Sequence, residues 1–124
     1  MQSFDGGCHC GAIRFRVTVD DAQELIDCNC SVCTKKGIVH VIVPEERFAL
    51  LQGDDAIATY SFNTGVAKHM FCRTCGIHPF YRPRSHPFGW DVNVRCLDDT
   101  SVLDRFPRRA FDGRHWEANV ASIR

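Results

Sequence analysis

The clearest pattern in the chain is a strict alternation of apolar and polar residues over positions 12–19. The apolar residues occupy every second position: Ile13, Phe15, Val17 and Val19. Because successive side chains of a strand point to opposite faces, this pattern predicts a β-strand with one buried face. Residues 90–96 alternate in the same way and are predicted to form another half-buried strand.

A different kind of strand is expected at residues 38–43, where the side chains are nearly all apolar and β-branched. Such a run predicts a strand that is buried on both faces and ends at Pro44. Further strands are expected at residues 48–51, 57–62, 67–71 and 77–81, a helical turn at 100–106, and one more turn and short strand at 111–116. The sequence therefore predicts an all-β fold of short antiparallel strands with at most one short helix, in a single domain spanning residues 1–124.

Charge and hydropathy narrow the classes of partner. The chain has 15 basic and 15 acidic residues, which give a net charge of zero. This balance argues against a nucleic acid or an anionic membrane as the partner. No apolar run approaches the roughly 18–20 residues of a membrane-spanning helix. Residues 1–5 have neither a basic nor a hydrophobic signal region, so we expect the cytoplasm, where thiols stay reduced.

Seven of the eight cysteines lie in three tight clusters. The clusters are the pairs Cys8 and Cys10, and Cys72 and Cys75, and the triplet Cys28, Cys30 and Cys33. Spacings this short supply neighbouring thiolate ligands to zinc. A disulfide framework is the alternative, but it needs an oxidising compartment, and cysteines one or two residues apart are poorly placed to pair. The spacing therefore favours a metal.

Ligand counting divides the seven clustered cysteines unevenly. A closed tetrahedral site needs four thiolates, so the two outer pairs are expected to form one structural zinc site. The triplet then forms a second zinc site with an open position, as in a catalytic zinc centre. A fourth protein ligand would close that site instead, and the candidates are Cys96, His40, His69 and His78. A redox function of Cys30 and Cys33 is a further alternative, although the chain lacks the βαβ pattern typical of such motifs.

Two arginines flank Pro83 shortly after Cys75. Arg82 and Arg84 offer forked donors suited to carboxylates, although exposed arginines are also common on ordinary protein surfaces. For a thiol compound that bears carboxylates, the sequence predicts that both arginines bind it, with Asn93 and Trp90 lining the same cleft.

The order of these motifs is distinctive: Gly-Cys-His-Cys-Gly at 7–11, Cys-Asn-Cys-Ser-Val-Cys at 28–33, Phe-Cys-Arg-Thr-Cys-Gly at 71–76, Arg-Pro-Arg at 82–84, Asn-Val at 93–94 and Phe-Asp-Gly-Arg-His-Trp at 111–116. In this order they resemble the glutathione-dependent formaldehyde-activating enzyme family, which also includes centromere protein V. The resemblance extends over nearly the whole chain. It implies an Mss4-like zinc-binding β fold.

The resemblance also implies a chemistry. By position, Cys8, Cys10, Cys72 and Cys75 would hold the structural zinc, and Cys28, Cys30 and Cys33 the second, which agrees with the division reached by counting. The implied activity is that of a carbon–sulfur lyase that interconverts glutathione plus formaldehyde and S-hydroxymethylglutathione. A non-catalytic zinc-binding interaction module, a thiol-binding protein or a metal buffer are the alternatives from other functional classes.

Overall fold

The structure is a computed structural model that describes residues 1–124. Its ten strands are β1 (Gln2–Gly7), β2 (Arg14–Val19), β3 (Leu25–Cys28), β4 (Val39–Val43), β5 (Phe48–Gln52), β6 (Ile57–Tyr60), β7 (Lys68–Cys72), β8 (Phe80–Arg82), β9 (Trp90–Asn93) and β10 (Arg108–Phe111). Its helices are α1 (Ser31–Lys36), α2 (Val102–Arg105) and α3 (Trp116–Asn119). None of them has the length and apolar character that crossing a membrane requires.

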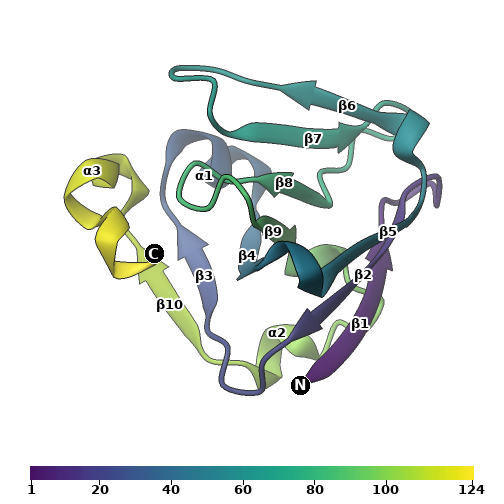
Figure 1. Ribbon diagram of the computed structural model, residues 1–124, viewed down its shortest axis with the longest axis horizontal. Coiled ribbons are helices and arrows are strands. Elements are labelled where there is room, and N and C mark those ends of the chain that lie inside the picture. Colours follow the sequence, from purple (N-terminus) through teal and green to yellow (C-terminus); the bar gives the residue numbers. More distant parts are fainter.

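The strands form two sheets (Figure 1). The smaller sheet has the order β1-β2-β5, and the larger has the order β10-β3-β4-β9-β8-β7-β6. Strands β10 and β3 are parallel, and the other paired strands are antiparallel. The predicted all-β fold is confirmed.

Helix α2 lies within the predicted helical turn at 100–106, and α1 and α3 are additional short helices. Helix α1 is fixed by its ends rather than by an amphipathic pattern. Cys30 caps its start, where its Sγ accepts a hydrogen bond from the Cys33 amide, and Gly37 ends it with a φ of 66°. A helix of six residues is too short to show a periodic apolar face, so the sequence pattern gave no sign of it.

The strand expected at 90–96 is shorter in the structure. Strand β9 ends at Asn93, and residues 94–96 form a 3₁₀ turn. The cause is local, because the Asn93 side chain accepts a hydrogen bond from the Arg95 amide and turns the backbone out of the sheet. Residues 113–115 form a 3₁₀ turn and α3 begins at Trp116, so the short strand expected within 111–116 is wrong. The structure instead has β10, which ends at Phe111.

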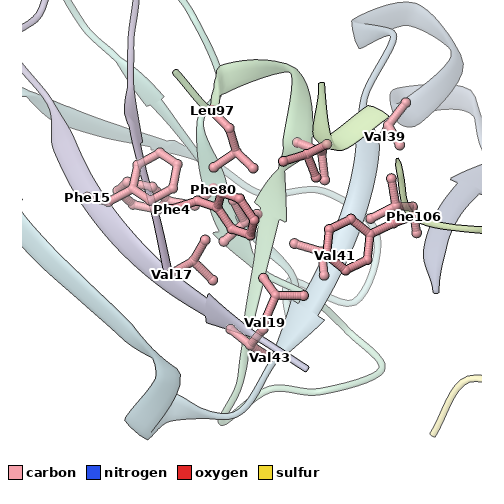
Figure 2. Close-up of a cluster of buried hydrophobic side chains, with 14 of the residues drawn as sticks. Phe4, Phe15, Val17, Val19, Val39, Val41, Val43, Phe80, Leu97 and Phe106 are labelled. Atoms are coloured by element: carbon pink, nitrogen blue, oxygen red, sulfur yellow. The ribbon is translucent and has the colours of Figure 1, made fainter. Parts of the chain in front are cut away.

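The main hydrophobic core lies between the two sheets (Figure 2). Strand β2 contributes Phe15, Val17 and Val19, as its alternation predicts, and strand β4 faces them with Val39, Val41 and Val43. Phe80 on β8 packs edge-on against Phe15, with ring centroids 5.7 Å apart. This packing fixes which face of the large sheet is apolar.

The opposite face of the large sheet is buried as well, but it is polar. His40 on β4, Asp91 on β9, Tyr81 on β8 and His69 on β7 all have small exposed fractions. Tyr81 is paired in register with both Asp91 and His69. Strand β4 is therefore buried on both faces, as predicted, with valines on one side and His40 on the other.

Candidate metal centres and an adjoining cavity

The four outer cysteines meet at one place between the two sheets. Cys8 and Cys10 follow β1, and Cys72 and Cys75 lie at the end of β7 and in the turn after it. Their sulfur atoms all lie within 4.8 Å of one another. Cys10 Sγ is 3.7 Å from Cys72 Sγ and Cys8 Sγ is 3.6 Å from Cys10 Sγ. A tetrahedral zinc with bonds of about 2.3 Å has a sulfur–sulfur edge of about 3.8 Å, so the donor set fits this ion.

Backbone amides support negative charge on these sulfurs. The Ile13 amide donates a hydrogen bond to Cys8 Sγ at 3.2 Å. The amide of Cys75 lowers the pKa of the Cys72 thiol. Both turns contain a glycine with positive φ, 83° at Gly11 and 78° at Gly76, a backbone conformation that side chains with a Cβ adopt with difficulty. The backbone of these turns therefore directs N–H groups toward the cysteine sulfurs.

The triplet forms a second group, whose three sulfurs also lie within 4.8 Å of one another. Cys28 is the last residue of β3, Cys30 caps α1 and Cys33 lies in its first turn. The Cys33 amide donates to Cys30 Sγ at 3.4 Å, and the Cys30 amide to Cys28 Sγ at 3.5 Å. Hydrogen bonds from the other two cysteine thiols, together with the helix amides, lower the pKa of Cys30 well below its ordinary value. The group therefore favours a thiolate, the form that zinc binds.

All eight cysteines are free, so the disulfide framework is not formed. The triplet group comprises cysteines alone, without a histidine or carboxylate. Of the proposed fourth ligands, Cys96 lines a smaller cleft beside Cys8, and its thiol is directed to the His78 carbonyl at 3.8 Å. His78 lines that same cleft and accepts from Lys36 Nζ at 2.6 Å. Neither residue lines the cavity at the triplet.

The triplet lines a cavity of about 710 Å³, within the usual size range for small-molecule sites. The polar face of the large sheet forms part of its lining, with His40, His69, Tyr81 and Asp91. The β6–β7 hairpin contributes Phe62, and the C-terminal segment contributes residues 113–118. In the view of Figure 1, α1 lies between this hairpin and α3. The three thiols thus border a cavity large enough for a small molecule or a very short peptide.

A hydrogen-bonded histidine–aspartate pair is buried in the polar face of the sheet. His40 Nδ1 lies 2.9 Å from each carboxylate oxygen of Asp91, and both side chains are at most 3% exposed. Tyr81 Oη lies 3.4 Å from the same nitrogen. Burial alone would lower the pKa of His40, but the charge and hydrogen bond of Asp91 raise it above its ordinary value. The sequence indicates His40 only as a possible metal ligand, and no motif in it points to Asp91.

The C-terminal segment is tied directly to the triplet. Asn29, between two of the cysteines, donates to Asp112 Oδ1 at 2.9 Å and accepts from the Arg114 amide at 3.0 Å. Arg114 Nε donates to the Asn29 carbonyl at 2.9 Å. These bonds hold residues 113–118 as one wall of the cavity. The motif at 111–116 was the only sequence signal of this wall.

The predicted substrate-binding residues are separated in the structure. Arg84 lines the cavity, with its guanidinium 3.8 Å from the ring centroid of Trp116 and 3.7 Å from Glu117. Arg82 instead lies over Trp90 at 3.6 Å and pairs with Glu45. The Asn93 side chain donates from Nδ2 to the His78 carbonyl at 3.1 Å, and Asn93 lines the smaller cleft. Arg84 is thus the one of the three that the structure brings to the triplet's cavity.

Comparison with known proteins supplies the family. Residues 3–111 match the family model described as glutathione-dependent formaldehyde-activating enzyme. The chain is 26% identical over 118 residues to a protein of Halomonas elongata named "Putative glutathione-dependent formaldehyde-activating enzyme", covering 85% of this chain and 71% of that protein. A crystal structure of a Rhodobacter sphaeroides protein superposes with a TM-score of 0.74 at 32% identity, covering 85% of this chain and 99% of that one. The chain therefore belongs to the glutathione-dependent formaldehyde-activating enzyme family.

Proposed function

We propose that this protein is a zinc-dependent carbon–sulfur lyase that interconverts glutathione plus formaldehyde and S-hydroxymethylglutathione. The observation that carries the proposal is the triplet Cys28, Cys30 and Cys33, a three-sulfur donor set without a fourth protein ligand on the wall of a large cavity. A zinc held by three protein ligands keeps one position for a substrate atom, whereas the four-sulfur group would hold a structural zinc.

The donor sets fit zinc at both places, and the roles of the two ions would differ. When bound at the triplet, zinc supplies Lewis acidity that favours a thiol in its thiolate form. The residues Cys28, Cys30 and Cys33 line the cavity and would hold the zinc ion at its wall. The residues Cys8, Cys10, Cys72 and Cys75 join the two sheets, and none of them lines the cavity at the triplet.

The cavity supports a small acidic thiol as substrate. Glutathione carries two carboxylates, and Arg84 places a guanidinium on the cavity wall. Its partner Glu117 is largely exposed, so a substrate carboxylate can replace it at modest cost. Substrate contacts by Arg82 and Asn93 stay sequence predictions, because both side chains are engaged elsewhere.

Two successive measurements test this function. Native mass spectrometry of the purified chain is expected to give two zinc ions, with glutathione adding to the two-zinc species. Exchange between free formaldehyde and the glutathione adduct, followed by magnetisation-transfer NMR, is then expected to be faster than in an enzyme-free control with the same free zinc.

Replacement of Cys30 by serine is the matched variant. It is expected to abolish the acceleration while leaving the first zinc in place. An exchange rate equal to the enzyme-free control, with glutathione still bound, would identify the protein as a thiol-binding module and contradict the lyase.

A further inference from the structure

The buried pair His40 and Asp91 has one polar atom without a protein partner. His40 Nδ1 is bonded to Asp91, whereas His40 Nε2 is buried and makes no hydrogen bond. His40 is 2% exposed and lines the same cavity as the three cysteines of the triplet. A buried nitrogen without a partner is unfavourable, so a group in the cavity is expected to supply one.

Asp91 fixes what His40 can offer. Because the carboxylate of Asp91 accepts from Nδ1, the neutral imidazole carries its proton there and leaves Nε2 as an acceptor. When protonated, Nε2 becomes a donor to the same position. Both residues lie on adjacent, paired strands, β4 and β9, so the ring is held by the sheet rather than by a mobile loop. This arrangement can take up a proton and return it without movement of the backbone.

We propose that His40 is the proton-transfer residue of the carbon–sulfur reaction and that Asp91 positions it, an inference that rests on the function proposed above. In the forward direction, His40 Nε2 takes the proton from the glutathione thiol. The thiolate sulfur then forms a bond to the formaldehyde carbon, and the electron pair of the carbon–oxygen π bond moves to oxygen. The oxygen receives the proton from His40 Nε2. No proton or electron is left over, and the reverse reaction follows the same steps.

The other buried histidines do not fit this role. His78 also has an unpartnered Nε2, but it lines the smaller cleft and its Nδ1 is bonded to Lys36. His69 lines the cavity, but its ring is stacked between Phe62 and Tyr81, with centroid distances of 5.3 and 4.8 Å. His78 therefore offers a matched control, since it is similarly buried and lies outside the cavity.

The experiment compares His40→Gln with His78→Gln in the zinc-loaded protein, using the same formaldehyde exchange measurement. Glutamine keeps a polar side chain of similar reach but cannot carry a proton between two oxygen or sulfur atoms at neutral pH. We expect His40→Gln to lose about 100-fold in the catalysed rate at saturating glutathione, in line with general acid–base catalysis. We expect two zincs per chain, a glutathione Kd within about threefold of the wild type, and a nearly unchanged rate for His78→Gln.

A second variant distinguishes the loss of proton transfer from a folding defect. His40→Ala is expected to recover activity when imidazole is added, because the free ring can occupy the space of the missing side chain. Recovery distinguishes proton transfer from a structural role, which added imidazole would not restore.

The outcomes separate this inference from the proposed function. A wild-type rate equal to the enzyme-free control contradicts the lyase itself. A wild-type acceleration that persists in His40→Gln, or His40→Ala that imidazole does not rescue, overturns the role of His40 alone. Loss of one zinc from His40→Gln also overturns it, because His40 would then be the fourth ligand of the triplet site.

Discussion

Gly113 is the residue through which the C-terminal segment contacts the triplet. A Cβ at this position would lie 2.5 Å from Cys28 Sγ and 3.0 Å from the Cys30 Cβ. Carbon and sulfur atoms do not approach this closely without displacement of one of them. The backbone of Gly113 has no positive φ, so packing against the cysteines, rather than chain conformation, excludes a side chain.

Replacing Gly113 by alanine is therefore expected to weaken the second zinc site selectively. The added methyl group must push Cys28 or Cys30 from its place, and changes beside metal ligands typically cost about 10- to 100-fold in affinity. Zinc per chain, measured by native mass spectrometry after incubation with a graded series of chelators, should fall from two to one at a lower chelator concentration than in the wild type. The four-sulfur site in the same molecule is the control. The prediction would be contradicted if the wild type and the Gly113→Ala variant each lost both zinc ions at the same chelator concentration.

At the scale of single residues, the sequence predicts which cysteines group together better than it predicts what surrounds them. The seven clustered cysteines are recognisable because their spacing is local and independent of the fold. Asp91 and Gly113 carry no such signal, since an acidic residue in a strand and a glycine in a turn are both common. The role of Asp91 depends on strand pairing, which places it beside β4. The role of Gly113 depends on the hydrogen bond from Asn29 to Asp112, which holds the C-terminal segment against the triplet.

Among the elements, the C-terminal segment after β10 changes the interpretation of the site most. Its 3₁₀ turn and α3 supply a cavity wall that includes Trp116, on which the guanidinium of Arg84 rests. The sequence predicted a strand here, because a segment of a few residues shows no helical period. The strands at 12–19 and 38–43 were predictable, because burial of one or both faces imposes a pattern that neighbouring elements do not alter.

Arg84→Gln tests the contribution of this wall to binding. If the guanidinium holds a glutathione carboxylate, its loss should weaken glutathione binding by about tenfold, the equivalent of one hydrogen bond to a charged group. Isothermal titration of the zinc-loaded protein measures the change. Arg82→Gln removes the same charge two residues away, at a side chain engaged with Glu45 and Trp90.

The comparison decides between two arrangements. The cavity geometry leads us to expect weaker binding for Arg84→Gln alone, whereas the sequence motif predicts weaker binding for both variants. Equal affinity in all three proteins would mean that neither arginine contacts the substrate.

In the molecule as a whole, the proposed function gives the two cysteine groups different roles, one in stability and the other in chemistry. The four-sulfur group joins β1 of the small sheet to β7 of the large one, and Cys10 and Cys72 are 62 residues apart in sequence. Ligands this far apart in sequence meet only in the folded chain, so the free energy of zinc binding there would stabilise the whole fold. The triplet lies within six consecutive residues, so an ion can also bind it in the unfolded chain and then stabilises the fold far less.

Paired serine substitutions test this division. Cys10 is exposed, so replacing its sulfur by oxygen would cost within about 0.5 kcal/mol if it bound nothing. If Cys10 binds a structural zinc, Cys10→Ser should instead lower the free energy of unfolding by several kcal/mol, since structural zinc contributes about 10–16 kcal/mol in small domains. Cys30→Ser should cost about 1 kcal/mol or less, because serine retains the capping acceptor that Cys30 provides to the Cys33 amide. Urea unfolding at fixed free zinc gives both values. Equal losses, or a larger loss for Cys30→Ser, would assign the structural role to the triplet instead.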